Sequence, residues 1–186
     1  MAFDPFPKMP RLSREIIVTE KIDGTNAQIY IDDDGDILAG GRTRWITSED
    51  DNFGFAAWVE DNEKQLRDLG PGRHFGEWWG MGIQRKYGMA ERRFSLFNVS
   101  RWQDERPDCC HVVPVLYRGL FETPAIEGCL SMLRTSGSVA APGFMKPEGF
   151  IVFHVAGNVG FKKTVEKDEI PKGMTSTHKH GSAEHE

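Results

Sequence analysis

Short apolar segments, separated by turn residues, recur along the chain, and this pattern favours β-strands. The apolar run at residues 16–18 predicts a buried first strand, and strict alternation at residues 27–31 predicts a second. In all, we expect strands at about residues 15–21, 27–31, 37–41, 92–99, 111–116, 150–153 and 159–164. This strand pattern fixes where the polar residues considered below are placed.

Two segments have the period of a helix instead. One helix is expected over about residues 55–69, where apolar residues recur at helical spacing until Gly-Pro-Gly at 70–72 stops them. The other begins at Thr123 and Pro124, which suit an N-cap and a first helical position, and continues to Leu133. The sequence therefore predicts a mixture of strands and helices.

Composition indicates a soluble globular protein, since 39% of the 186 residues are hydrophobic and 27% are charged. The apolar runs are too short to span a membrane, and residues 1–10 lack the apolar segment of a signal peptide. Three cysteines do not make a disulfide framework, so we expect a reducing, cytoplasmic location. The net charge of −5 argues against a broad basic surface for nucleic acid, but not against a local one.

One domain is expected to carry all of the candidate chemistry. The Pro-rich residues 1–14 predict an extended N-terminal arm, and residues 15–170 predict the domain itself. The charged and then Gly-, Ser- and His-rich residues 171–186 predict a disordered tail.

Lys21 stands at the end of the first predicted strand, directly before a turn at residues 23–26. A lysine held at such a sheet edge faces a cleft and can act as a nucleophile when its amine is neutral. An ordinary surface turn has the same composition, because Asp and Gly are common turn residues. Residues elsewhere in the chain have to decide between these two interpretations.

Further polar residues stand in or beside the strands. Arg42 and Arg44 lie two apart on a predicted strand and so share a face, where they suit phosphate or ribose oxygens, or solvent. Glu77 lies among apolar residues and glycines, and a buried glutamate needs a partner such as ribose hydroxyls, a metal or an arginine. Phe97 shares a strand face with Ser95, which suits base stacking or core packing.

Taken in order, these segments resemble the motifs of the covalent nucleotidyltransferase superfamily, which contains ATP-dependent DNA and RNA ligases and mRNA capping enzymes. The resemblance covers about residues 15–164. The asparagine that closes the first motif and the short aromatic motif are closest to the virus-type RNA ligases. The matching segments are 21–26 for motif I, 41–44 for motif Ia, 75–78 for motif III, 94–99 for motif IIIa, 148–152 for motif IV and 161–163 for motif V.

The resemblance implies an α+β fold of antiparallel sheets with flanking helices, as in the adenylation domain of this superfamily. It also implies an ATP-dependent RNA ligase that uses Mg²⁺ and forms lysyl-AMP at Lys21. AMP would pass to an RNA 5′-phosphate end, and a 3′-hydroxyl end would displace it. The nucleotide-binding residues implied are Glu20, Asn26, Arg42, Glu77, Phe97, Glu148, Lys162 and Lys163.

Individual roles follow from the same resemblance. Glu77 would hold the ribose, Phe97 would stack on adenine and Glu20 would help to read the adenine amino group. Glu148 would bind Mg²⁺ or shape the site around it, and the arginines of motif Ia with the lysines of motif V would surround the phosphates.

Two positions depart from the family pattern. Motif V usually has two lysines separated by one residue, whereas Lys162 and Lys163 are adjacent, which leaves open the one that meets the phosphates. Asn98 stands where related ligases often have aspartate, so it can accept a hydrogen bond but supplies no charge.

The sequence indicates the residues that would bind the acceptor end less clearly than those that would bind the nucleotide. The basic residues Arg85, Lys86, Arg92 and Arg93 flank motifs III and IIIa and could hold a 5′-phosphate end, or form a solvated loop. An adenylating DNA ligase-like enzyme and a non-catalytic nucleotide- or RNA-binding relative are the alternative functions. A protein partner that supplies extra nucleic-acid grip is compatible with either kind of ligase.

Overall fold

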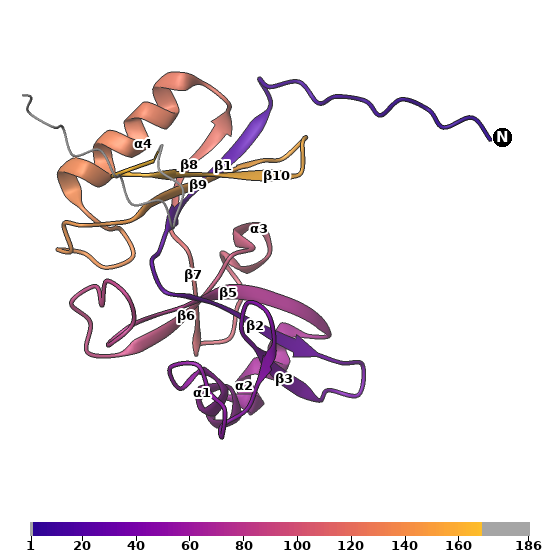
Figure 1. Cartoon of the computed structure of the whole chain (residues 1–186), viewed down its shortest axis with the longest axis vertical. Coiled ribbons are helices and arrows are strands. Elements are labelled where there is room, and N and C mark those ends of the chain that lie inside the picture. Colours follow the sequence, from indigo (N-terminus) through magenta and orange to yellow (C-terminus); the bar gives the residue numbers. More distant parts are fainter. Residues whose placement is uncertain (1, 169–186) are drawn as a thin grey trace, which may run out of the picture.

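Two β-sheets organise residues 2–168, which are the residues that the computed structural model describes (Figure 1). The small sheet has the strand order β10-β9-β1-β8, and the large sheet has the order β4-β3-β2-β5-β6-β7. The small sheet contains β1 (Glu15–Lys21), β8 (Val115–Leu120), β9 (Gly149–His154) and β10 (Val159–Thr164). The large sheet contains β2 (Thr25–Ile31), β3 (Ile37–Gly40), β4 (Trp45–Ile46), β5 (Gly72–Gly80), β6 (Arg92–Leu96) and β7 (Cys110–Val112).

The expected α+β architecture of antiparallel sheets with flanking helices is confirmed, with one local difference. Every strand pair is antiparallel except β6 and β7, which run parallel. The helical elements are α1 (Phe55–Asp61), α2 (Glu63–Leu66), the 3₁₀ turn η1 (Arg67–Leu69), α3 (Val99–Trp102) and α4 (Thr123–Ser136).

The helix expected over residues 55–69 is wrong as a single element. The chain breaks at Asn62, whose φ of −109° and ψ of 8° lie outside the helical region. The Asn62 side-chain amide donates a 2.8 Å hydrogen bond to the carbonyl of Trp58. Asparagine competes in this way with helical backbone bonding, which the apolar spacing alone does not register.

Each sheet buries one face against helices. In the large sheet, Ile29, Trp78 and Phe94 pack against Phe55 and Leu66 of α1 and α2. In the small sheet, the buried face packs against α4, with a core of Ile16, Val18, Cys129, Leu133, Phe150 and Val152. A third apolar cluster contains Ile17, Ile22, Trp79, Tyr87, Val99, Val113 and Ala141 and connects the two sheets. The remaining sheet faces are therefore turned toward one another around this cluster.

The chain crosses between the sheets at two places that matter for the site. Lys21 ends β1 in the small sheet, and Thr25 begins β2 in the large sheet only a few residues later. The strand expected at residues 111–116 is likewise two strands, because β7 belongs to the large sheet and β8 to the small one. Pro114 lies at that break, and proline cannot donate a ladder hydrogen bond.

The structure describes residues 2–168, so it covers most of the expected N-terminal arm but none of the expected tail. Residues 2–14 form no helix or strand, and β1 begins at Glu15 as expected. The predicted tail at 171–186 lies outside the described residues. Within residues 2–168, no helix has the length and apolar character needed to cross a membrane.

Gly149→Ala should destabilise the fold by about 2–4 kcal/mol. Gly149 has a φ of 155°, and a Cβ there would collide with the carbonyl oxygen of Lys163 in the neighbouring strand. Gly160→Ala is the matched control on β10, because its Cβ would meet only Ile151 Cγ2 at 3.8 Å. Urea unfolding should show a large loss for the first variant and a change within about 1 kcal/mol for the second. Equal losses would contradict this explanation.

Candidate active site

A cavity of about 570 Å³ lies between the two sheets. Both sheets contribute to its wall: Lys21 and Ile151 come from the small sheet, and Asn26 and Glu77 come from the large one. Phe97, directly after β6, also lines it. The structure thus brings together residues from four distant segments of the chain, among them the expected nucleophile Lys21 and the expected nucleotide-binding residues Asn26, Glu77 and Phe97.

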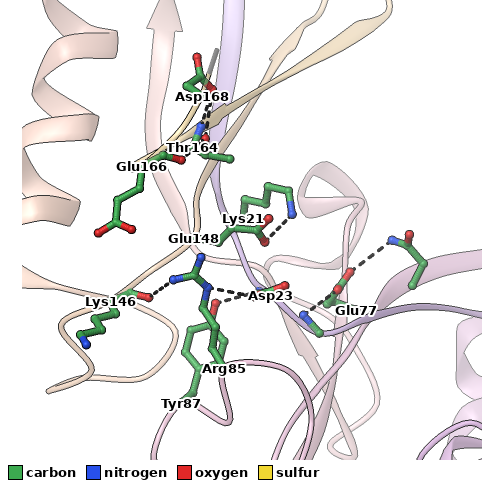
Figure 2. A network of polar contacts seen from close by, with 12 residues as sticks. Lys21, Asp23, Glu77, Arg85, Tyr87, Lys146, Glu148, Thr164, Glu166 and Asp168 are labelled. Carbon is green, nitrogen blue, oxygen red and sulfur yellow. Dashed lines mark hydrogen bonds and ion pairs between the residues drawn. The ribbon is translucent and has the colours of Figure 1, made fainter. Parts of the chain in front are cut away.

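The amine of Lys21 lies against the carboxylate of Glu148, with 2.5 Å between Nζ and Oε2 (Figure 2). Strand register explains the contact, because Lys21 pairs with Gly149, the residue that follows Glu148. The Glu148 side chain is buried, whereas that of Lys21 is 22% exposed. The amine is therefore held by a buried carboxylate while it remains accessible from the cavity.

The turn after Lys21 is fixed by residues of the 82–88 loop (Figure 2). The backbone N–H of Asp23 donates to the hydroxyl of Tyr87 at 2.8 Å. Arg85 Nε donates to Asp23 Oδ2 at 2.9 Å, and Arg85 Nη1 donates to the carbonyl oxygen of Lys146 at 3.0 Å. Arg85 thus connects the turn after Lys21 to the segment just before Glu148.

Glu77 is buried on β5 and faces the turn that follows Lys21. Its carboxylate accepts a 2.9 Å hydrogen bond from the backbone N–H of Gly24 and a 3.3 Å bond from Asn26 Nδ2. Burial raises the pKa of Glu77 to about 7, although the Gly24 N–H and the charge of Lys21 act in the opposite direction. Glu148 and Asp23 add smaller contributions that raise this pKa.

The Glu20 carboxylate, for which the resemblance implied a contact with the adenine amino group, is held by the loop that follows α4. Successive strand residues point to opposite faces, so the Glu20 and Lys21 side chains diverge. The Glu20 carboxylate accepts hydrogen bonds from Ser138 Oγ at 2.5 Å and from the N–H groups of Val139 and Ala140 at 2.8 Å. Glu20 forms part of the cavity wall, but its carboxylate is committed to the loop that follows α4.

The aromatic motif has the faces that its alternation predicted. Phe94 and Leu96 are buried in the core of the large sheet, whereas Phe97 is partly exposed and lines the cavity. Asn98 lines the cavity too, and its Oδ1 accepts a 3.2 Å hydrogen bond from the N–H of Arg101. Asn98 therefore caps α3, a task for which its missing charge is no disadvantage.

The two lysines of the last motif lie on opposite faces of the small sheet. Lys162 pairs with Ile151, which pairs with Thr19, and both partners line the cavity. Lys163 pairs with Phe150, whose side chain belongs to the core under α4, and its amine forms a 2.8 Å ion pair with Asp168. Register therefore puts Lys162 on the face that carries Lys21.

The arginines of motif Ia are not on a strand. Arg42 and Arg44 lie in the turn between β3 and β4, so the expected common strand face is wrong. Both are exposed, Arg44 forms an ion pair with Asp50, and neither lines the cavity.

The other basic residues expected at the acceptor make mostly local contacts. Lys86 is exposed, Arg92 Nε donates to the carbonyl of Met81, and Arg93 pairs with Glu91 at 2.5 Å. None of them lines the cavity. The sequence did not predict that Arg85 and Tyr87 contact the turn after Lys21. The one hint was a single aromatic residue in a basic loop.

The described part of the chain has no site in which protein side chains alone would hold a metal ion. Residues 2–168 contain no cluster of three or more His, Cys, Asp or Glu side chains that could hold an ion. A single carboxylate that shares Mg²⁺ with substrate phosphates is a common arrangement, and Glu148 fits it.

Comparisons with known proteins agree with this geometry. A family model described as RNA ligase matches residues 14–168. Two structures of Naegleria gruberi RNA ligase mutants with ATP and manganese have TM-scores of 0.63, at 22% and 23% identity, covering 83% of this chain and 51% of theirs. A third, with AMP and manganese, has a TM-score of 0.64 at 21% identity, covering 82% of this chain and 50% of that one.

At these identities the likeness establishes the fold, and the chain spans about half the length of the solved relatives that it matches. The comparison with curated proteins gives no match.

Glu77→Gln should reduce the pH dependence of the free energy of unfolding. Because the folded pKa of about 7 lies above the ordinary 4.5, the folded state holds this proton more tightly. Glu77 therefore stabilises the fold most below pH 4.5, and this contribution is lost as the pH rises through 7, by up to about 3 kcal/mol. Urea unfolding at about pH 5, near the lower end of this window, and at about pH 8, roughly one unit above its upper end, should show a smaller decrease in the free energy of unfolding for the variant than for the native protein. Equal decreases in the free energy of unfolding of the native protein and the variant would contradict this assignment to Glu77.

Proposed function

The chain belongs to the RNA ligase family, and from its site we propose that it is an ATP-dependent RNA ligase that carries AMP on Lys21. One observation carries the proposal: a partly exposed lysine amine contacts a buried carboxylate at the wall of a cavity between two sheets. A cavity of about 570 Å³ is within the usual range for small-molecule sites. The Naegleria gruberi relatives solved with ATP or AMP support a nucleotide as the occupant.

In the first step, Lys21 Nζ loses one proton to become a neutral amine and then attacks the α-phosphorus of ATP. The N–P bond forms, the bond to pyrophosphate breaks, and a second proton leaves Nζ. Glu148 Oε2 lies 2.5 Å from Nζ and is the acceptor best placed for that proton. The product is a lysyl-AMP phosphoramidate.

In the second step, an RNA 5′-phosphate oxygen attacks the same phosphorus, and the Lys21 amine leaves and regains both protons. In the third, the 3′-hydroxyl of a second end attacks the 5′-phosphate phosphorus and AMP leaves. The resulting phosphodiester joins the two ends, and the protein returns to its starting state.

The large sheet would orient the nucleoside. The Glu77 carboxylate can accept hydrogen bonds from ribose hydroxyls, and Asn26 beside it adds a polar group to the wall. Phe97 offers an exposed ring for the adenine base. These contacts would place the α-phosphorus near Lys21 at the junction of the sheets.

Glu148 would hold Mg²⁺ together with the phosphates of ATP. When bound, the ion supplies positive charge that offsets the charge on the phosphates as pyrophosphate leaves. The manganese in the solved relatives supports a divalent cation in this role.

Lys162 is the motif V lysine that we assign to the phosphates, because it shares a sheet face with Lys21 and the cavity residue Ile151. The next position on that face is Thr164, so the second lysine of the usual pair is replaced by a hydroxyl. Arg42 is exposed and does not line the cavity, so its contact with the phosphates stays a prediction.

RNA ends are the proposed acceptors, and a DNA end is the alternative. Arg85 is better assigned to holding the turn after Lys21 than to the acceptor, because it contacts Asp23 and the Lys146 carbonyl. Lys86, Arg92 and Arg93 remain candidates for the 5′-phosphate. A protein partner that adds grip, and a cytoplasmic location, also remain proposals.

Lys21→Ala should abolish covalent labelling by ATP. The native protein, incubated with Mg²⁺ and ATP labelled at the α-phosphate, should give an acid-labile protein adduct. Lys146→Ala is the control, since Lys146 stands shortly before Glu148, its side chain is exposed, and only its backbone carbonyl contacts Arg85. Equal labelling of the Lys21 variant would overturn the assignment of the nucleophile.

Lys162→Ala should slow adduct formation at least about tenfold, while Lys163→Ala should change it less than about threefold. The two variants remove the same charge from adjacent positions of β10, and only one of the positions faces the cavity side of the sheet. Single-turnover labelling rates at saturating ATP compare them directly. A slower rate for the Lys163 variant would show that strand register does not decide which lysine acts.

A further inference from the structure

The face of the large sheet that carries Glu77 continues beyond the nucleotide cavity. Because alternate strand residues share a face, Asn26 and Glu77 are followed along β2 and β5 by other residues on the same side. Their neighbours on that side are Gln28, Tyr30, Phe75 and Arg73, and Trp45 joins them from β4 through its pairing with Gly40. The opposite face of these strands is the buried one.

Tyr30, Trp45 and Arg73 form a preorganised cluster on this face. The Arg73 guanidinium lies 5.1 Å from the ring centroid of Tyr30 and 5.1 Å from that of Trp45. The two rings are 6.1 Å apart, and Arg73 Nη1 donates a 2.9 Å hydrogen bond to Gln28 Oε1. The cluster therefore keeps its arrangement without a ligand.

Two aromatic side chains on this face are accessible to solvent. Phe75 is 53% exposed and Trp45 is 41% exposed, although the sheet already has a complete core on its other side. Arg73 and Phe75 also line the cavity, and Phe75 is next to Phe97, whose N–H donates to its carbonyl. The exposed aromatic surface and the nucleotide cavity are thus one continuous surface.

We propose that Tyr30, Trp45, Arg73 and Phe75 form a stacking platform for the bases of single-stranded RNA whose end reacts at Lys21, an inference that rests on the proposed function. Exposed aromatic rings stack on bases of any sequence, and an arginine between them can stack on a base or contact a phosphate. A chain with a net charge of −5 has little general attraction for RNA, so base contacts become the main source of affinity. Continuity with the cavity leads a strand from the platform toward Lys21.

Trp45→Ala tests the platform, because Trp45 does not line the nucleotide cavity. The probe is a fluorescein-labelled single-stranded RNA of about 12 nucleotides, a length typical of such binding sites, measured by anisotropy. An abasic strand of equal length and charge reports phosphate contacts alone. Trp45→Phe keeps an aromatic ring, and Phe161→Ala removes a ring that is more exposed (59%, against 41% for Trp45) from β10 in the small sheet.

We expect Trp45→Ala to weaken binding of the RNA about tenfold and to leave binding of the abasic strand and labelling of Lys21 by ATP unchanged. Trp45→Phe should retain most of the affinity, and Phe161→Ala all of it. If Trp45→Ala binds the RNA with native affinity, as it would if the platform served a protein partner, the proposal is overturned. It is also overturned if Trp45→Ala weakens binding of the RNA and of the abasic strand equally, or if Phe161→Ala weakens RNA binding as much as Trp45→Ala does.

Binding and labelling are separate measurements, so the two proposals can fail separately. Native labelling at Lys21 together with RNA binding that ignores Trp45 would remove the platform and keep the adenylating enzyme. RNA binding that depends on Trp45 in a protein that is never labelled would support the platform and remove the ligase.

Discussion

The pairing of β1 with β9 is the constraint on which the site depends. It places Lys21 opposite Gly149 and therefore beside Glu148. A buried carboxylate is costly without a compensating charge, and removing one partner of such a pair typically costs about 3–5 kcal/mol. The contact thus links chemistry to folding, since the residues that position the amine also satisfy a buried charge. Gly149 makes this possible because its backbone tolerates a conformation and a proximity to β10 that a side chain would forbid.

The alternation of side chains along a strand then places neighbouring polar residues on opposite faces of the small sheet. Adjacent carboxylate and amine at Glu20 and Lys21 have different tasks, because one side chain meets the loop after α4 and the other meets the cavity. The same rule separates Lys162 from Lys163. In each pair one residue serves the core side of the small sheet and the other serves the side that faces the large sheet. A substitution at one member of a pair therefore reports on a different function from the same substitution at its neighbour.

The local sequence pattern predicted many of the strands and site residues correctly. It failed where contacts between distant residues determine the structure. The bounds of β1 and β10 follow from apolar runs and turn residues, and α4 starts one residue before the expected position, with Glu122 rather than Thr123 as its N-cap. Motif order indicated Lys21, Glu77 and Glu148. The break at Asn62 and the division of residues 111–116 between two sheets depend on a side-chain hydrogen bond and on topology, which periodicity does not contain. The Glu20 contacts and the Arg85 bridge join residues more than 60 positions apart, so no spacing in the sequence announces them.

An acidic chain that handles RNA has to obtain affinity at short range. Phosphate contacts act over distance but weaken as salt rises, and their strength grows with the number of cations in reach. Base stacking acts only on contact and depends little on charge, and it requires bases whose faces are free. An exposed aromatic surface beside the cavity would therefore favour unpaired RNA over duplex, and would do so at salt concentrations that suppress general binding. On the proposed function, selection of the end that reacts at Lys21 would then begin on the sheet face, before any bond is made.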